Sequence, residues 1–181
     1  MTMTLADARV VTPEGVHDGW LTIEDGRITH VGQGTAPGPG RSLGGRYVVP
    51  GFVDIHNHGG AGGSFPTGDP DEASRIAALH ARHGTTTLVA SLVTASLDNL
   101  ARATSALADL CEDGLLAGIH FEGPYIAKAR CGAHDPRCCA SPRSGSSVSC
   151  WRRAVVMCGC SPSPPSCRGR WTPSGRRRRT A

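Results

Sequence analysis

Short hydrophobic runs separated by turn residues indicate that residues 1–47 form a small β unit. The strand candidates are residues 5–11, 20–24 and 27–31. The last two are joined through Asp25-Gly26, a dipeptide that favours a hairpin with a type I′ turn. Residues 32–45 are rich in Gly and Pro, so we expect them to connect this unit to the next one.

From residue 50 the hydrophobic pattern changes to alternating strands and helices. Asp69 is expected to be the N-cap of the first helix, with Pro70 as its first residue and Glu72 closing a capping box. The helix should end just before Gly84, where a left-handed C-terminal residue is easiest to accommodate.

Three hydrophobic segments alternate with the predicted helices and are expected to be strands: residues 53–55, 85–90 and 115–121. Ser96 is expected to cap the second helix, whose apolar residues recur with the 3.6-residue period until the chain reaches Gly114. Strands and helices at this spacing predict an α/β fold with a parallel sheet and right-handed crossovers.

The motif His56-Asn57-His58 follows the first of these strands. Side chains alternate across a strand, so Asp54, His56 and His58 are expected on one face. Two imidazoles two residues apart can bind one cation, and imidazole suits zinc, iron, nickel or copper. Asp54 could then orient one of the rings.

Glu122 lies at the carboxyl end of the third predicted strand, where an α/β barrel builds its active site. Together with His56 and His58 it would form a mixed nitrogen and oxygen site for one or two divalent cations. His120 is expected to pack rather than to bind metal. The next loop carries Ala133-His134, where a ligand could be held.

Charge divides the chain near residue 136. Residues 1–135 hold nine of the 19 Lys and Arg and all 15 acidic residues, and therefore have a net charge of −6. Residues 136–181 hold ten Arg and no acidic residue, Lys or His, a net charge of +10. Seven of the eight Cys lie at or after Cys131, so two kinds of sequence are joined in one chain.

Two interpretations of the segment 137–181 remain. In the first, the segment is unstructured and out of frame, because a frameshift in a GC-rich gene turns Leu codons into Cys, Arg, Pro and Ser codons. In the second, it is a basic nucleic-acid-binding tail or a Cys-rich metal cluster. Its Cys residues lack C-x₂-C spacing and it has no Lys, which favours the first interpretation.

The hydropathy of the chain predicts neither a membrane span nor a secretion signal. No run approaches the ~18 apolar residues that a membrane helix needs, and the N-terminus lacks a charged and apolar leader. We therefore expect a cytoplasmic protein without a membrane or nucleic-acid partner.

Four motifs carry a resemblance to a known family: PGFVDIHNHGG from Pro50, HGTTT from His83, GIHFEGPY from Gly118 and GAHDP from Gly132. In this order and spacing they resemble the N-terminal half of the N-acetylglucosamine-6-phosphate deacetylases, which belong to the amidohydrolase superfamily. The H-F-E-G-P element is much more particular to these deacetylases than the H-x-H pair. The resemblance covers roughly residues 1–136.

The resemblance implies an architecture of three segments. Residues 1–49 would be part of a small β-sandwich, and residues 50–136 would be the first three or so strands of a TIM-like (β/α)8 amidohydrolase barrel. Residues 137–181 would be the disordered, out-of-frame tail.

The resemblance also implies a chemistry. Glu122, His56 and His58 would bind a divalent metal, zinc first, with iron, nickel, manganese or cobalt as alternatives. Ala133 and His134 would contact an amino-sugar phosphate, a small-molecule substrate. The reaction would be hydrolysis of N-acetylglucosamine 6-phosphate to glucosamine 6-phosphate and acetate, in a homo-oligomeric enzyme.

The family's later metal-binding histidines and its catalytic aspartate, the general base, should lie beyond residue 136, where the chain has no His and no Asp. We therefore assign no catalytic residue and expect the chain to be inactive and poorly soluble by itself. Two alternatives stay open: another amidohydrolase that acts on a cyclic amide or an N-acyl amino acid, and a non-catalytic metal- or nucleic-acid-binding protein that uses the basic tail.

Overall fold

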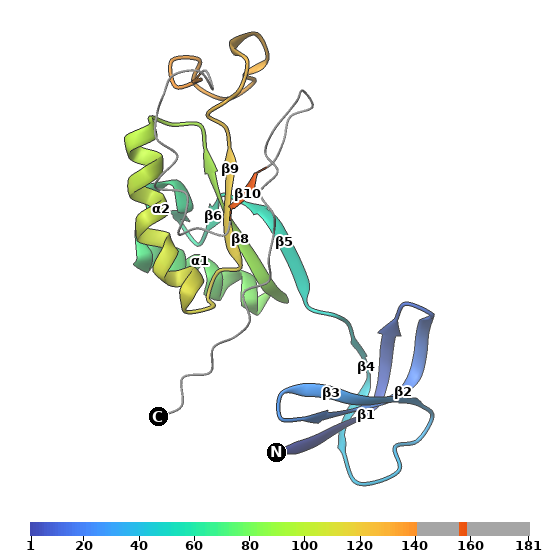
Figure 1. Ribbon diagram of the computed structural model, residues 1–181. Helices are drawn as coiled ribbons and strands as arrows, with labels where there is room; N and C mark the ends of the chain where they lie inside the picture. The colour runs from blue at the N-terminus through green and yellow to red at the C-terminus, as the bar shows by residue number, and fades with distance from the viewer. Residues whose placement is uncertain (141–155, 159–181) are drawn as a thin grey trace.

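The structure is a computed structural model that describes residues 1–140 and 156–158. Within these residues it contains two four-stranded sheets, a two-stranded ribbon and two α-helices. The first sheet and the α/β unit are joined through the link between residues 48 and 52 (Figure 1).

The N-terminal sheet has the strand order β3-β2-β1-β4. β2 is antiparallel to both β1 and β3, whereas β4 is parallel to β1. Its small core is made of Ala8, Val10 and Leu21. The strands are β1 (Thr2–Thr12), β2 (Gly15–Glu24), β3 (Arg27–Gln33) and β4 (Arg41–Val48).

The predicted hairpin between β2 and β3 is confirmed. Asp25 and Gly26 have φ values of 48° and 74°, and a type I′ turn requires a positive φ at both positions. The predicted connector 32–45 is wrong at both of its ends, because β3 extends to Gln33 and β4 begins at Arg41.

The second unit is a mixed α/β fold with the sheet order β10-β9-β8-β5, and every pair of neighbouring strands in it is parallel. The two α-helices cross between consecutive strands, as the sequence predicts. The elements are β5 (Phe52–Asn57), α1 (Pro70–Arg82), β8 (Thr85–Val93), α2 (Leu97–Glu112), β9 (Gly118–Glu122) and β10 (Val156–Cys158).

Short elements complete the described chain. A ribbon of β6 (Gly59–Gly60) and β7 (Gly63–Ser64) leads into the 3₁₀ turn η1 (Phe65–Thr67) before α1. A second 3₁₀ turn, η2 (Lys128–Arg130), follows β9.

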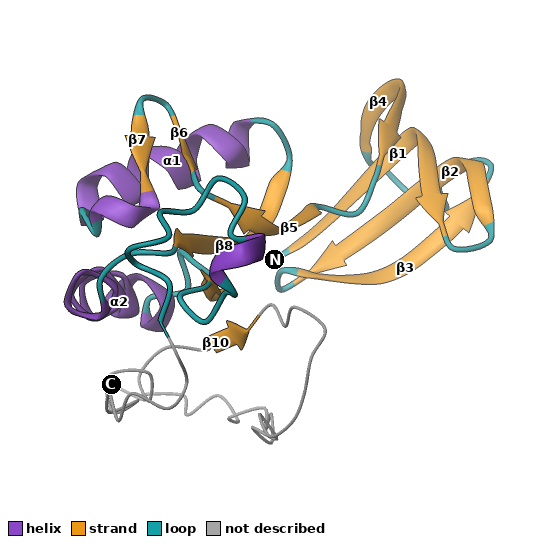
Figure 2. Cartoon of the chain, turned by 90° about the horizontal axis from the view of Figure 1, so that it is seen from above, coloured by secondary structure: helices purple, strands orange, loops and turns teal. Residues whose placement is uncertain are grey.

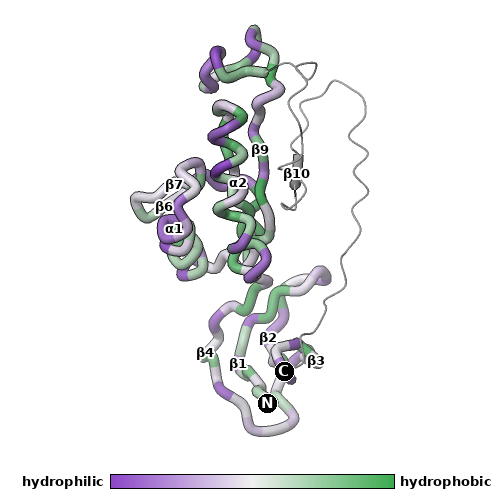
Figure 3. Tube along the Cα trace, turned by 60° about the vertical axis from the view of Figure 1, so that its left-hand side comes forward, coloured by the Kyte–Doolittle hydropathy of each residue, from purple (hydrophilic) through white to green (hydrophobic). Residues whose placement is uncertain are grey.

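The helices α1 and α2 cover one face of the parallel sheet, as the view from above shows (Figure 2). Alternate residues of β8 and β9, such as Leu92 and Phe121, point toward the helices and are almost fully buried. From α1 and α2, Ile76 and Leu107 pack into the same core. Hydrophobic and polar residues alternate along α2 (Figure 3), which leaves its polar side to solvent.

The capping of α1 differs from the predicted capping box. The Asp69 carboxylate accepts hydrogen bonds from the backbone N–H groups of Asp71 and Glu72, as expected of an N-cap. The Glu72 carboxylate accepts from the Ser64 N–H and the Thr67 hydroxyl instead of from Asp69. The reciprocal bond is absent because Glu72 holds the preceding loop. Ser96 caps α2 as predicted, accepting from the Asn99 N–H.

Most of the segment 137–181 lies outside the described residues. The described part of this segment includes residues 156–158, which form β10 beside β9. The backbone N–H and C=O groups along the free edge of β9 need hydrogen-bond partners, and β10 supplies them as a parallel strand. The predicted nucleic-acid or Cys-cluster role of the tail falls mostly on residues outside the described ranges. Neither α1 nor α2 combines the length and hydropathy of a bilayer span, so the described residues include no candidate membrane helix.

Candidate metal centre

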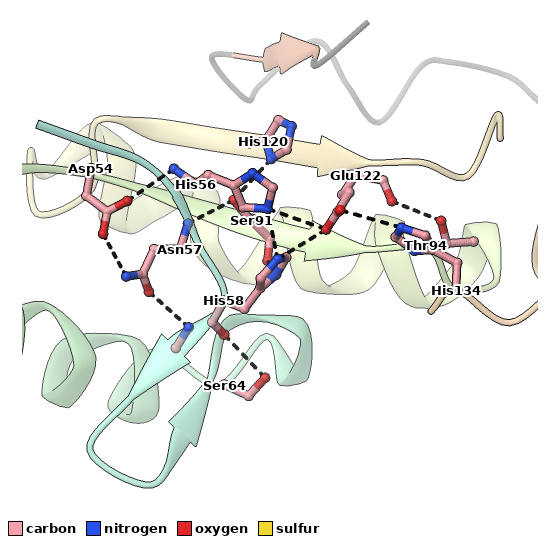
Figure 4. A network of polar contacts seen from close by, with 11 residues as sticks. Asp54, His56, Asn57, His58, Ser64, Ser91, Thr94, His120, Glu122 and His134 are labelled. Atoms are coloured by element: carbon pink, nitrogen blue, oxygen red, sulfur yellow. Dashed lines mark hydrogen bonds and ion pairs between the residues drawn. The ribbon is translucent and has the colours of Figure 1, made fainter. Parts of the chain in front are cut away.

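Three side chains from β5, the loop after it and the end of β9 meet at one point (Figure 4). The Nε2 atoms of His56 and His58 lie 3.0 Å apart. Glu122 Oε2 lies 3.1 Å from His58 Nε2 and 3.5 Å from His56 Nε2. The structure thus brings together the three residues that the sequence singled out as metal ligands.

The parallel sheet is the reason for this convergence. Parallel strands end at the same edge, so residues that follow β5 and residues at the end of β9 lie close together. In the register of β8 and β9, Glu122 pairs with Val93 and His120 with Ser91. The side chains of Ser91, His120 and Glu122 therefore face away from the helices, on the same face as the two imidazoles.

Asp54 does not play the predicted role. The register of β5 and β8 shifts between Asp54 and Asn57, which breaks the strict alternation that the sequence analysis assumed. The Asp54 carboxylate accepts from the backbone N–H of His56 at 3.2 Å and from Asn57 Nδ2 at 2.8 Å. It therefore holds the backbone that carries the ligands instead of orienting a ring.

Asn57 ties the ligand loop to helix α1. Its Oδ1 accepts from the Gly59 N–H at 2.9 Å, and its Nδ2 lies 3.1 Å from His80 Nε2. His80 Nε2 also lies 3.2 Å from the carbonyl oxygen of Gly59. The backbone on both sides of His58 is thus held in place, although the sequence carries no signal for these contacts.

The hydrogen bonds of His58 determine which of its nitrogens is free. His58 Nδ1 lies 3.1 Å from the carbonyl oxygen of Ser91, and a carbonyl can only accept. Nδ1 therefore carries a hydrogen, and in the neutral ring the lone pair of Nε2 points at His56 and Glu122. A lone pair facing a carboxylate oxygen requires a cation or a proton between them.

The donor set and its spacing fit a divalent metal. Two imidazole nitrogens with one carboxylate oxygen are a common zinc set, and bonds of about 2.0 Å place tetrahedral ligands about 3.3 Å apart. The observed separations of 3.0, 3.1 and 3.5 Å surround that value. All three side chains are a third to a half exposed, so the site is open to solvent.

His120 lies beside the cluster without joining it. Its side chain is buried, and its Nδ1 lies 3.0 Å from the Ser91 hydroxyl. The centre of its ring is 5.0 Å from that of His56. Burial lowers the pKa of His120, and the neighbouring His56 lowers it further. His120 packs as predicted, but it does so beside the candidate ligands, because residues 120 and 122 are two positions apart and share one face of the sheet.

An open pocket of about 380 Å³ adjoins the three side chains. His134 Nε2 lies 3.5 Å from Glu122 Oε1. The two residues expected to contact substrate, Ala133 and His134, therefore lie in the same pocket as two of the candidate ligands. The pocket is lined by His58, Val93, Thr94, Glu122, Ala133, His134 and Asp135.

Asp135 is the second carboxylate of this pocket, and Arg137 neutralises it. Arg137 donates through Nε at 3.0 Å and through Nη2 at 2.8 Å to the two carboxylate oxygens. This pairing lowers the pKa of Asp135, so its carboxylate is a weaker proton acceptor than an unpaired one.

Thr94 and Gly123 hold Glu122 in position. The Thr94 hydroxyl donates to the Glu122 carbonyl oxygen at 2.9 Å. Gly123 has a φ of 102°, and a Cβ atom there would collide with Thr94 Oγ1. Position 123 therefore requires glycine if Glu122 is to keep its place, and the sequence alone gave no sign of this role.

Comparisons with known proteins agree with this geometry. Residues 47–162 match the sequence model of the Amidohydrolase family. The N-acetylgalactosamine-6-phosphate deacetylase of Escherichia coli O157:H7 is 32% identical over 75% of this chain and 37% of its own length. The N-acetylglucosamine-6-phosphate deacetylase of Lysinibacillus sphaericus is 33% identical over 64% of this chain and 31% of its own length.

A solved structure is similar as well. It is a mutant of the N-acetyl-D-glucosamine-6-phosphate deacetylase of Mycobacterium smegmatis in complex with N-acetyl-D-glucosamine-6-phosphate, 47% identical, with a TM-score of 0.73. The match covers 78% of this chain and 38% of that one. The chain thus spans less than two fifths of the length of each of these three relatives.

Proposed function

The chain belongs to the amidohydrolase family, and we propose that its described residues form the metal-binding part of a deacetylase active site. The substrates of this site would be N-acetylated amino-sugar 6-phosphates. The reaction is hydrolysis of the acetamide of N-acetylglucosamine 6-phosphate to glucosamine 6-phosphate and acetate. The convergence of His56, His58 and Glu122 is the observation that carries the proposal. The substrate class comes from the relatives, which are N-acetylglucosamine-6-phosphate deacetylases.

In this proposal the two imidazoles and the Glu122 carboxylate hold a divalent cation, with zinc preferred for the two nitrogen ligands. Such a cation polarises an acyl oxygen and activates water. Ala133 and His134 contact the substrate from the adjoining pocket, where His134 lies against Glu122. Asp54 and Asn57 keep the ligand loop in register.

The same proposal extends to the architecture. Residues 50–136 are the first strands of a (β/α)8 barrel, residues 1–49 belong to a small β-sandwich, and residues 137–181 form a separate tail. The parallel order of β5, β8 and β9 with both helices on one face supports the barrel start. The TM-score of 0.73 to a deacetylase supports it as well.

We expect no deacetylation by residues 1–181 alone. Asp135 lines the pocket, but Arg137 holds it as an ion pair with a lowered pKa, which makes it a poor general base. Among the described residues we assign the general base to none. Binding of metal and of substrate therefore tests the proposed site, whereas turnover tests whether the chain contains a general base.

The first experiment is a Zn²⁺ titration of the purified 181-residue chain by calorimetry. We expect one zinc site, and a chain that binds no Zn²⁺ would overturn the proposed metal centre. N-acetylglucosamine 6-phosphate is then added to the zinc-loaded chain, with N-acetylglucosamine as the matched ligand without phosphate. Release of acetate by the chain would contradict the expected inactivity and would place a general base within it.

A second substrate has specific support, because one relative is named as an N-acetylgalactosamine-6-phosphate deacetylase. Both sugar phosphates should therefore be compared with a cyclic amide and an N-acetyl amino acid. If the chain binds the cyclic amide or the N-acetyl amino acid but neither sugar phosphate, the alternative amidohydrolase activities are favoured over deacetylation of an amino sugar.

A further inference from the structure

Ser91, in β8, contacts all three segments that build the metal centre. It is completely buried, which is unusual for a polar residue without a structural partner. Its hydroxyl oxygen lies 3.1 Å from the backbone nitrogen of Asn57 and 3.0 Å from His120 Nδ1. Its carbonyl oxygen lies 3.1 Å from His58 Nδ1 (Figure 4).

The carbonyl group of Ser91 determines the tautomer of His58. Since the carbonyl oxygen only accepts, His58 carries its hydrogen on Nδ1. In the neutral ring Nε2 then carries no hydrogen, and it is the nitrogen that faces His56 and Glu122. A metal ligand needs such a nitrogen, and the partner of its other nitrogen keeps the ring in this orientation.

The hydroxyl group of Ser91 has the opposite effect on His120. The Asn57 N–H can only donate, so it occupies a lone pair of the hydroxyl oxygen. If His120 Nδ1 donated to the hydroxyl oxygen, the hydrogen of this buried hydroxyl group would have no acceptor among the described residues. His120 Nδ1 therefore accepts it, and the hydrogen of the ring is on Nε2. In this state neither nitrogen of His120 offers a free lone pair to a cation.

We propose that Ser91 is a positioning residue of the metal centre, which makes His58 a ligand through its carbonyl group and keeps His120 out of the ligand set through its hydroxyl group. This inference rests on the proposed function, because it concerns the ligands of the same site. It explains why two histidines on one face have different roles. Through Asn57, the same hydroxyl also anchors the backbone between His56 and His58.

The tautomers can be tested without metal. In nitrogen-detected NMR spectra of the full chain at a pH where the imidazoles are neutral, we expect His58 with its hydrogen on Nδ1 and His120 with its hydrogen on Nε2. Resonances are assigned by replacing each histidine with Gln in turn. Hydrogen on Nδ1 of His120 in the wild-type chain would overturn the inference, whatever the variants below do.

The second test is the Zn²⁺ affinity of Ser91→Ala, which keeps the carbonyl group and removes the hydroxyl group. We expect the affinity to fall by up to about 10-fold, the lower end of the cost of losing a group that supports metal ligands, because the backbone between His56 and His58 loses its anchor at Asn57 while His58 keeps its carbonyl partner. The tautomer of His120 should become mixed. Ser91→Thr keeps the hydroxyl group and should stay closer to the wild-type affinity than to that of Ser91→Ala.

Thr104→Val is the matched control, since Thr104 is a buried hydroxyl residue of α2 with no hydrogen-bond partner in the described chain. It should leave the Zn²⁺ affinity unchanged. If the wild-type chain binds Zn²⁺ and Ser91→Ala binds it equally well, the role of Ser91 is wrong and the metal centre stands. If the wild-type chain binds no Zn²⁺, the proposed function fails, and the tautomers still decide whether Ser91 orients the two rings.

Discussion

At the scale of single residues, the candidate centre depends on side chains that are open to solvent but held by their neighbours. His56, His58 and Glu122 are each at least a third exposed. Ser91, in β8, holds the ring of His58, and Thr94, directly after β8, holds the backbone of Glu122. An exposed site of this kind binds a metal tightly only when its ligands are oriented in advance.

Glu122→Gln should weaken Zn²⁺ binding by more than the roughly 10- to 100-fold that is lost when a hydrogen-bond partner of a metal ligand is removed. The amide keeps the size of the side chain but removes the only charged donor of the three. Calorimetric titration measures the change. Glu24→Gln, at the exposed end of β2, is the control, and equal affinities of the two variants would contradict the assignment of Glu122.

The thiol of Cys111 should make stability fall in alkaline solution. Burial raises its pKa to about 11, and the Glu112 carboxylate adds to the effect. Well below pH 9 the thiol is protonated in both the folded and the unfolded state. Between pH 9 and about 11 it ionises in the unfolded state first, so the free energy of unfolding decreases.

We expect a decrease of about 1 kcal/mol, after allowing for the partial exposure of Cys111. Urea unfolding at several pH values measures it. Cys111→Ala should lack this part of the slope, and parallel curves for the variant and the wild-type chain would show that Cys111 does not titrate as described.

At the scale of elements, helix ends and strand ends determine where the site residues lie. α1 begins at Pro70 because the Asp69 carboxylate satisfies two of its first backbone N–H groups, at 2.8 and 3.1 Å. Glu72 then fastens the loop that leads from the ligand residues into the helix. The caps therefore support the metal centre as well as the helix.

Asp69→Ala should lower the free energy of unfolding by about 1 kcal/mol, because two N–H groups of α1 lose their acceptor. Asp69→Asn keeps an oxygen acceptor and should differ from the wild-type chain by only a few tenths of that. Chemical denaturation of the three proteins provides the comparison. A stability of Asp69→Ala equal to that of Asp69→Asn would mean that the cap contributes nothing.

Gly123→Ala should both destabilise the chain and weaken Zn²⁺ binding, since a Cβ atom at Gly123 collides with Thr94 Oγ1 and displaces Glu122. Gly114→Ala is the control that separates the backbone strain of a positive φ from the collision with Thr94. Gly114 also has a positive φ, of 78°, but a Cβ atom there would meet nothing within 4 Å. Its expected cost is only the roughly 1–2 kcal/mol of a left-handed residue, with unchanged Zn²⁺ affinity. Normal Zn²⁺ affinity of Gly123→Ala would refute the link between Thr94 and the position of Glu122.

At the scale of the whole molecule, the parallel sheet has an unpaired edge within the described chain. β5 lies at the end of the sheet order and has β8 as its one described neighbour. Its apolar side chains Phe52, Val53 and Ile55 are each more than half exposed. An exposed apolar edge strand is a site for self-association.

We therefore expect light scattering to show concentration-dependent association of the chain. The double variant Val53→Thr with Ile55→Thr should reduce it. Val16→Thr with Ile28→Thr removes a similar amount of exposed apolar surface in the N-terminal sheet and should have a smaller effect. Equal effects of the two double variants would mean that association does not proceed through β5.

The elements and the ligand types were largely predictable from the sequence by itself, because they depend on local chemistry. The cap at Asp69, the turn at Asp25-Gly26 and the strand preceding His56 each follow from a few neighbouring residues. His56, His58 and Glu122 stood out because their side chains bind metals and because they follow strands that a parallel sheet brings to one edge.

Only the tertiary structure decided how these residues are held. The register shift in β5 turns Asp54 toward Asn57, which no alternation pattern foretells. The contacts of Ser91 with Asn57, His58 and His120 join residues 29 to 34 positions apart, and such contacts exist only once the strands have paired. Composition and period therefore determine which chemistry the chain can carry, whereas strand register determines which nitrogen of which histidine is free to perform it.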